Sequence, residues 1–356
     1  MVFLVALAVS ILFTVVILTT DKFHKNFTHD RDLSGRQKFH YVPVPRVGGV
    51  AFILGFFGGA VYYGFENDNE LYLLYWAGVA AVPVFIGGFL EDLSKNIKVI
   101  NRLLLAFFSA AIAHYELGLS LDRIGWVWFD ENILVIPGVS LALMVFMVGG
   151  VAHATNIIDG FNGLLLGFVV LVLGVFGWVA YQVGDVLALN MILIMGGATV
   201  GLFIFNFPRG KIFLGDGGAY FIGFLLALIS LLILRNRQIS PWFPLLVLSY
   251  PVFETIFSIY RKKVLRGTPI TQPDRFHLHM LVHRRIVGKY GKWFGGNRNA
   301  ATAPVMWGVS SLGMLPALFW WDRDWVMQLS IFAFCFGYIM FYFSIVRFKF
   351  RRIFTS

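Results

Sequence analysis

Four acidic residues interrupt an otherwise strongly apolar sequence. Glu91 and Asp92 lie in "GGFLEDLSKN", Asp159 lies in "HATNIIDGFNGL", and Asp216 lies in "KIFLGDGGA". Mg²⁺ takes oxygen ligands, usually one or two carboxylates together with the phosphates of a substrate. An unpaired Asp deep in a membrane span costs about 2.5–3.5 kcal/mol. A functional role is therefore favoured for Asp159 over plain turn chemistry, whereas "EDLSK" taken alone favours a solvated helix end.

Cationic and histidine side chains accompany these acids. They are Lys38 and Arg46 in "KFHYVPVPRVGG", Lys95 after the first acidic pair, and Arg275, His277, His279 and His283 in "QPDRFHLHMLVHRR". Arg and Lys beside histidines suit a phosphate. Zinc is an alternative, but it normally takes a fourth ligand such as Cys, and Cys335 lies in a distant apolar run. A basic loop that attracts anionic lipid is the simpler alternative.

Together these residues predict a site for a pyrophosphate substrate with Mg²⁺. Phosphoryl transfer mainly requires neutralised charge and in-line positioning, which a metal ion and basic side chains supply. The glycines around Asp216 favour a helix start whose backbone N–H groups face an anion. The clusters all fall at one predicted membrane face, where a water-soluble nucleotide and a lipid phosphate can meet.

The elements that must position these residues are membrane helices. Charged residues make up 13% and hydrophobic residues 58% of the sequence, against about 25% charged in soluble domains. Runs near 20 apolar residues can each cross about 30 Å of hydrocarbon. The sequence therefore predicts an all-α, polytopic helical bundle of about eleven transmembrane helices in a single domain, 1–356. The predicted spans are 1–20, 47–65, 71–90, 99–116, 133–151, 162–182, 187–205, 217–234, 241–260, 303–320 and 325–347.

Lys and Arg residues divide unevenly between the two sides of this arrangement. Of 29 in all, only Arg123, Arg235, Arg237 and Arg323 fall on one side. Cytoplasmic loops carry the excess of basic residues, so the N-terminus is predicted outside and the C-terminus inside. The sequence pI of about 9.7 then reflects those loops, and nucleic-acid binding is not expected. The predicted catalytic cytoplasmic loops are about 21–46, 91–98, 152–161, 206–216 and 261–301.

The chain resembles the polyprenyl-phosphate N-acetylhexosamine-1-phosphate transferases, glycosyltransferase family 4. This family includes undecaprenyl-phosphate GlcNAc-1-phosphate transferases and is related to the phospho-MurNAc-pentapeptide translocases. Five motifs between about 38 and 285 occur in the family's order. The matching residues are Lys38, His40, Pro45, Arg46, Gly48 and Gly49; Glu91 and Asp92; His153, Asn156, Asp159, Gly160, Asn162, Gly163 and Leu164; Asn206, Phe213, Gly215, Asp216 and Gly218; and His277 to Met280.

The resemblance implies an enzyme that moves sugar-1-phosphate from a UDP-amino sugar to undecaprenyl phosphate and releases UMP. It further implies Mg²⁺ or Mn²⁺ as cofactor, with Asp216 as metal ligand. Catalytic roles are implied for Asp92, Asp159 and Glu91, and Asp92 would orient or deprotonate the lipid phosphate. The expected substrate-binding residues are Lys38, Arg46, Lys95, Asn156, Asn162, Asn206, Phe213, Arg275, His277, His279 and His283. The expected location is the bacterial inner membrane, and the oligomeric state stays open, with a homodimer as one option.

Several positions depart from the family pattern. Glu91 replaces an Asp, His153 an Asn, Asn162 an Asp and Met280 a His. These changes favour an enzyme that initiates a surface glycan such as O-antigen over the peptidoglycan translocase, and an inactive homologue is a further reading. Loop 286–302 is the expected place for sugar choice. A transporter or flippase for an anionic or lipid-linked solute is the alternative function, but transporters usually hold ionisable groups near the midplane.

Overall fold

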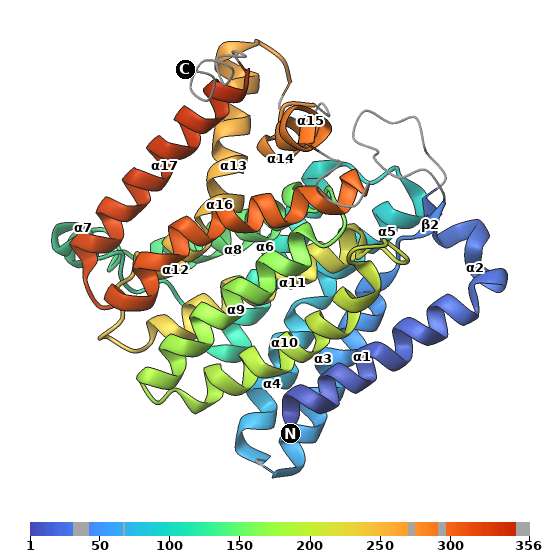
Figure 1. The fold of residues 1–356 in the computed structure, drawn as a ribbon. Coiled ribbons are helices and arrows are strands. Elements are labelled where there is room, and N and C mark those ends of the chain that lie inside the picture. The colour runs from blue at the N-terminus through green and yellow to red at the C-terminus, as the bar shows by residue number, and fades with distance from the viewer. Residues whose placement is uncertain (31–42, 67, 270–274, 291–296, 347–356) are drawn as a thin grey trace.

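The computed structural model describes residues 1–30, 43–66, 68–269, 275–290 and 297–346, and it is a bundle of helices (Figure 1). Nine helical segments in this described part are long and apolar enough to span a membrane. The structure therefore confirms the predicted all-α, polytopic membrane fold.

Helices of the first half of the chain are α1 (Val2–Thr19), α2 (Asp21–Thr28), α3 (Gly48–Glu66), α4 (Asp68–Ala80), α5 (Val82–Ser94), α6 (Val99–Leu117), α7 (Val127–Asn132), α8 (Val139–Ile158) and α9 (Leu164–Gln182). The second half contains α10 (Val186–Asn206), α11 (Gly215–Leu234), α12 (Phe243–Val247), α13 (Ser249–Tyr260), α14 (Leu278–Val282), α15 (Gly288–Tyr290), α16 (Arg298–Trp320) and α17 (Asp324–Val346). Two π-helical turns, η1 (Arg261–Leu265) and η2 (His283–Val287), follow α13 and α14.

Nine of the predicted spans coincide with these nine segments, and α4 and α5 together form one of them, Leu71–Ser94. The predicted span 99–116 is α6, which carries Asn101, Arg102 and Glu116 and is too polar to count among the nine. The predicted span 241–260 is divided at Leu248 into α12 and α13. Both differences follow from polar or proline-containing sequence inside otherwise apolar runs.

Two predicted loop boundaries were wrong because helices continue through polar residues. The loop predicted at 91–98 starts inside α5, which ends only where Lys95 adopts a left-handed conformation, φ 55°. The loop predicted at 152–161 is largely the last part of α8. The Thr155 hydroxyl donates to the carbonyls of Ala152 and Ala219, so the polar side chain is satisfied within the bundle.

Helix α11 is the centre of the bundle (Figure 1). It packs against α3, α5 and α8, and nearly every residue from Gly217 to Ile233 is buried. A helix that is apolar on all sides needs such an environment. Its first turn, with Asp216, therefore lies where several elements end.

A short antiparallel pairing carries the next segment to this point. Strands β1 (His29–Asp30) and β2 (Val44–Pro45) pair with His29 opposite Pro45. At the end of β2, the carbonyl of Pro45 accepts the N–H of Phe213, and just beyond it the N–H of Gly48 donates to the carbonyl of Phe213. These bonds fix Arg46 beside the start of α11. Helix α1 runs from the N-terminus, at the opposite end of the bundle, toward α2 and β2 (Figure 1).

Candidate functional site

Asp216 lies between two guanidinium groups in the first turn of α11. Arg46 Nη2 lies 2.7 Å from Asp216 Oδ1, and Arg102 Nη1 of α6 lies 2.9 Å from Oδ2. Ionised partners make these hydrogen bonds stronger than neutral ones. The side chain of Asp216 keeps 19% of its surface exposed, so a ligand can still reach it.

Asp92 caps the same helix from a neighbouring one. Its Oδ1 accepts the backbone N–H of Asp216 at 2.9 Å, and its Oδ2 accepts that of Gly217 at 3.0 Å. A carboxylate at a helix N-terminus satisfies otherwise unpaired N–H groups and offsets the positive end of the helix dipole. Arg46 Nη2 lies 3.3 Å from Asp92 Oδ1, so one guanidinium joins both carboxylates.

Two glycines permit this close approach. Gly215 has φ +81°, and a Cβ there would lie 2.3 Å from the Arg46 carbonyl oxygen and 2.6 Å from Asp92 Oδ2. A Cβ at Gly88 of α5 would lie 2.6 Å from the Cα of Gly217. Any side chain at either position would push α5 and α11 apart.

Asp159 completes the acidic group at the end of α8. It is half-buried, and burial raises the pKa of this carboxyl to about 7. The nearby Arg46 opposes that shift in pKa, and the negative charge of Asp216 adds to it. The charges of Arg46 and Asp216 thus act on both Asp92 and Asp159, which are far apart in sequence.

Glu91 lies in the last turn of α5, next to Asp92, and Lys95 follows the end of that helix. Glu91 Oε2 accepts the backbone N–H of Ile97 at 2.7 Å, which closes the turn. Lys95 is exposed. The described contacts give Glu91 a structural use, and the catalytic role predicted for it stays a prediction.

Two predicted substrate-binding residues, Asn162 and Asn206, connect loops in the structure. Asn206 is buried, and its Oδ1 accepts the N–H of Gly163 at 2.6 Å while its Nδ2 donates to the Ile212 carbonyl at 2.8 Å. The Nδ2 of Asn162 donates to the Pro208 carbonyl at 3.2 Å. Their side chains thus connect the segment after α8 to the segment after α10. Phe213 contributes backbone bonds to the segment after β2 and is half-buried.

The histidine segment is anchored on buried polar groups. His277 Nδ1 lies 2.9 Å from Oε1 of the fully buried Glu254 in α13, whose Oε2 accepts the N–H of Leu278 at 3.0 Å. His279 Nδ1 lies 3.1 Å from the Tyr250 hydroxyl. The rings of His277 and His279 stack with centroids 5.5 Å apart.

Phe161 links this histidine segment to Asp159. Its ring centroid lies 5.8 Å from that of His279 and 4.7 Å from that of His283. The Nδ1 of His283 lies 2.9 Å from the Thr302 hydroxyl, and burial lowers the pKa of this histidine. The histidines therefore border the acidic group. Arg275 is exposed at the start of this segment, and Lys38 lies outside the described residues.

The contact of Arg102 with Asp216 and that of His153 with Tyr220 were not predicted from the sequence. Arg102 fell inside a predicted span and was read only as a topological charge, although a charged residue within a span is itself a functional signal. His153 of α8 was singled out only as a departure from the family pattern. In the structure its Nδ1 lies 3.1 Å from the hydroxyl of Tyr220, one turn beyond Asp216 in α11. Asn156, also predicted to bind substrate, is half-buried on the same helix as His153.

A ready-made metal cluster is not part of this arrangement. Within the described ranges, three or more His, Cys, Asp or Glu side chains do not gather as metal ligands. The donor set still fits Mg²⁺, which takes one or two carboxylates and completes its shell with phosphates and water. Asp216 offers a partly exposed carboxylate, and its negative charge acts on the nearby Asp159.

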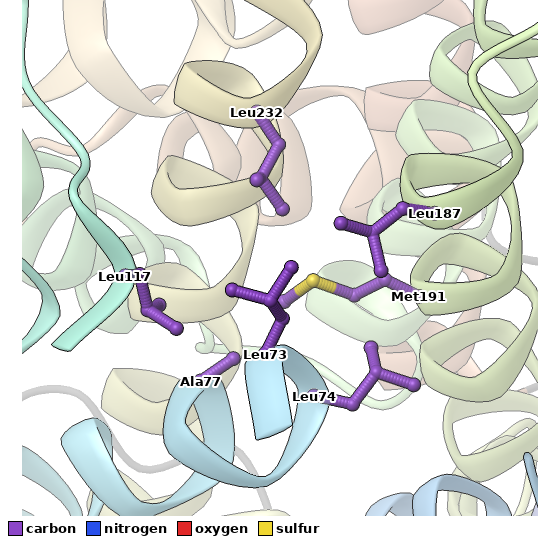
Figure 2. Close-up of a pocket in the computed structure, with 7 residues that line it drawn as sticks. All are labelled: Leu73, Leu74, Ala77, Leu117, Leu187, Met191 and Leu232. Carbon is purple, nitrogen blue, oxygen red and sulfur yellow. The ribbon is translucent and has the colours of Figure 1, made fainter. Parts of the chain in front are cut away.

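A small apolar cavity lies away from this polar group. Its lining comes from α4, α6, α10 and α11, with Leu232 near the far end of α11 from Asp216 (Figure 2). Its volume of about 10 Å³ is at the lower limit for one water molecule. It is a packing gap and not a substrate site. The lining residues are Leu73, Leu74, Ala77, Leu117, Leu187, Met191 and Leu232.

The fold and the polar group define a polytopic helical membrane protein with a carboxylate and guanidinium site at one end of its bundle. Comparison with known proteins gives the family. The model of glycosyl transferase family 4 matches residues 73–234. The chain is 30% identical over 253 residues to a probable undecaprenyl-phosphate N-acetylglucosaminyl 1-phosphate transferase of Bacillus subtilis, covering 70% of this chain and 68% of that protein.

A phospho-N-acetylmuramoyl-pentapeptide-transferase of Streptococcus pyogenes serotype M6 is 29% identical over 342 residues, covering 89% of this chain and 98% of the relative. The chain therefore belongs to glycosyl transferase family 4, which confirms the resemblance drawn from the motifs.

Proposed function

We propose that this protein transfers sugar-1-phosphate from a UDP-N-acetylhexosamine to undecaprenyl phosphate and releases UMP. Family membership supports a polyprenyl-phosphate hexosamine-1-phosphate transferase. The observation that carries the proposal is Asp216, held between Arg46 and Arg102 at a helix start that Asp92 caps. Carboxylates for a cation and guanidinium groups for phosphate meet there.

The reaction exchanges one phosphoric anhydride bond for another. An oxygen of the lipid phosphate attacks the β-phosphorus of the UDP-sugar, and the bond from that phosphorus to the bridging oxygen breaks. The electron pair leaves with UMP, so the product is a lipid diphosphate sugar. Because charge grows on phosphate oxygens, fixed positive groups stabilise the transition state most.

Residues of this chain supply that positive charge and its placement. Arg46 and Arg102 exchange their contacts with Asp216 for contacts with phosphate oxygens. Asp92 holds the first turn of α11 in place through two backbone bonds, which keeps Asp216 in a fixed position. The histidine segment, anchored by Glu254, borders the site.

Mg²⁺, or Mn²⁺ in its place, is the cofactor that we propose. Asp216 would hold the ion, with Asp159 as the adjacent carboxylate. The ion would neutralise diphosphate charge and act as a Lewis acid toward a phosphoryl oxygen.

The donor sugar and the pathway form the finer part of the proposal. We infer GlcNAc or a related amino sugar, and the initiating step of a lipid-linked surface glycan such as O-antigen. The departures at Glu91, His153, Asn162 and Met280 support a branch other than the peptidoglycan translocase. We also propose that the site faces the cytoplasm of a bacterial inner membrane, because the basic loops lie on that side.

A substrate panel tests this proposal. Purified protein in detergent is given undecaprenyl phosphate, Mg²⁺ and, in separate reactions, UDP-GlcNAc, UDP-GalNAc or UDP-MurNAc-pentapeptide. We expect UMP with one of the first two donors, dependent on the lipid. UMP from UDP-MurNAc-pentapeptide alone would reject the proposed branch, and no UMP from any donor would reject the transferase.

A further inference from the structure

His153 lies beside the candidate site, in contact with Tyr220. It belongs to α8, and its Nδ1 is 3.1 Å from the Tyr220 hydroxyl, with the two rings 4.8 Å apart. Its Nε2 is buried and has no hydrogen-bond partner among the described residues. Buried polar atoms in native proteins nearly always have a partner, so this nitrogen requires an explanation.

The neighbours of Tyr220 indicate which ring nitrogen of His153 carries the proton. The side chain of Asn156 also lies close enough to act on the Tyr220 hydroxyl. The amide group can donate to the phenol oxygen, which leaves the phenol O–H free to donate to His153 Nδ1. A neutral imidazole that accepts at Nδ1 carries its proton at Nε2. The unpartnered atom is therefore an N–H donor, and the ligand it suits is an oxygen acceptor.

A second unpartnered donor lies around the same ring. The guanidinium carbon of Arg102 is 5.8 Å from the Tyr220 ring centroid. Arg102 Nη1 binds Asp216, whereas its Nε is buried without a partner in the part of the chain that the structure describes. A neutral donor and a cationic donor around one ring suit an anionic oxygen, and phosphate is the anion of the proposed reaction.

The depth of His153 and Tyr220 within the bundle indicates whether the phosphate belongs to the nucleotide sugar or to the lipid. Tyr220 follows Asp216 by four residues along α11, which places it about 6 Å further along the helix axis. That direction leads into the apolar bundle, because the rest of α11 is buried and apolar. A nucleotide arrives from water on the loop side, where Lys95 is exposed. A lipid phosphate arrives with its chain in the hydrocarbon.

We propose, on the basis of the proposed function, that His153 Nε2–H and Arg102 bind a phosphate oxygen of the polyprenyl acceptor on the membrane side of Asp216. His153 is thereby a binding residue for the acceptor lipid and not for the nucleotide sugar. Tyr220 is a positioning residue, because its hydroxyl fixes the imidazole tautomer.

Paired amide substitutions test this proposal. In His153→Gln the amide nitrogen reaches the place of Nε2 and can donate, whereas in His153→Asn it reaches only the place of Nδ1. We expect His153→Asn and His153→Leu to raise the KM for undecaprenyl phosphate about tenfold or more, since a hydrogen bond to a charged group is lost. His153→Gln should stay within about threefold of wild type, and the KM for UDP-GlcNAc should change little in all three.

A binding measurement without metal gives a second readout. Undecaprenyl phosphate should raise the Tm of the wild type and of His153→Gln in detergent, and raise it less in His153→Asn. Inorganic phosphate and UDP are tested as ligands in the same Tm measurement. His114→Leu is the matched control, because His114 is a histidine of α6 whose Nδ1 lies 2.7 Å from the Leu119 carbonyl, away from this site.

Each outcome decides the proposal. A rise in the KM for UDP-GlcNAc instead of the lipid would assign the oxygen to the donor diphosphate and overturn it. Wild-type values for His153→Asn in both measurements would mean that a water molecule satisfies Nε2–H, which also overturns it. If the wild type released no UMP, the proposed function would fail, and the Tm shift by undecaprenyl phosphate would still test His153.

Discussion

At the scale of single residues, the site depends on charges that lie close together and are partly shielded from water. Asp92 and Asp216 carry like charges, and Arg46 lies within 3.3 Å of both. A buried carboxylate is tolerated only with such partners. Asp92 in addition accepts two backbone N–H bonds, so it also holds the first turn of α11 in place.

Asp159 makes stability depend on pH. Folding raises its pKa from 3.8 to about 7, so the folded state holds this proton more tightly than the unfolded state does. Its contribution to stability is fully present below about pH 4 and is lost as the pH rises through about 7. In metal-free buffer, the Tm of Asp159→Asn minus that of wild type should therefore increase between pH 5 and 8.5. A difference that is independent of pH would contradict this account of Asp159.

At the scale of elements, α13 and α17 hold the histidine segment. The carboxylate of Glu254 in α13 accepts hydrogen bonds from the His277 ring, the N–H of Leu278 and the hydroxyl of Tyr338 in α17. Three donors on one buried carboxylate fix the segment against two membrane helices. The position of the histidines therefore depends on a residue that is itself fully buried.

Glu254→Gln tests this anchor. An amide keeps the size but loses the charge and presents a donor to other donors, so we expect a loss of about 1–3 kcal/mol in stability and reduced UMP release. Tyr338→Phe is the milder matched variant, because it removes one of the three donors. Denaturation in detergent and UMP release measure the two effects. Normal values of both in Glu254→Gln would refute the anchoring role.

The far end of α11 is held by another contact. Arg123 donates to the carbonyl oxygens of Asn236 and Ile239 at 3.0 and 2.6 Å, which satisfies groups that follow the helix C-terminus. Arg123→Ala should lower stability by about 1 kcal/mol and leave both KM values unchanged, because the site is at the other end. Changed KM values at unchanged stability would show that this contact serves the site instead.

The sequence predicted the acidic group and the membrane fold, but not the way in which the parts are held. The acidic group and the membrane fold could be predicted because an Asp beside a span and an apolar run of about 20 residues are local signals in the sequence. Asp92 as a cap of α11 and Glu254 as the anchor of His277 join residues from separate helices, which no local pattern reports. Arg102 was overlooked because a charge inside a span was read only as topology.

At the scale of the whole molecule, the proposed reaction requires the protein to have one orientation in the membrane. The basic loops predict that Lys95 faces the cytoplasm and Arg237 the exterior. In a Cys335→Ser background, Lys95→Cys should resist a membrane-impermeant maleimide applied to intact cells, and Arg237→Cys should react. The opposite pattern would place the site on the outer side, away from cytoplasmic nucleotide sugars.

The central claim is that Asp216 and its neighbours carry out phosphoryl transfer between a nucleotide sugar and a polyprenyl phosphate. The most direct measurement is UMP release from UDP-GlcNAc by wild type, Asp216→Asn and Asp92→Asn, with and without undecaprenyl phosphate, in the presence of Mg²⁺. We predict lipid-dependent UMP from wild type and a loss of at least about 100-fold in both folded, membrane-inserted variants. Near-normal UMP release by both variants would contradict the account.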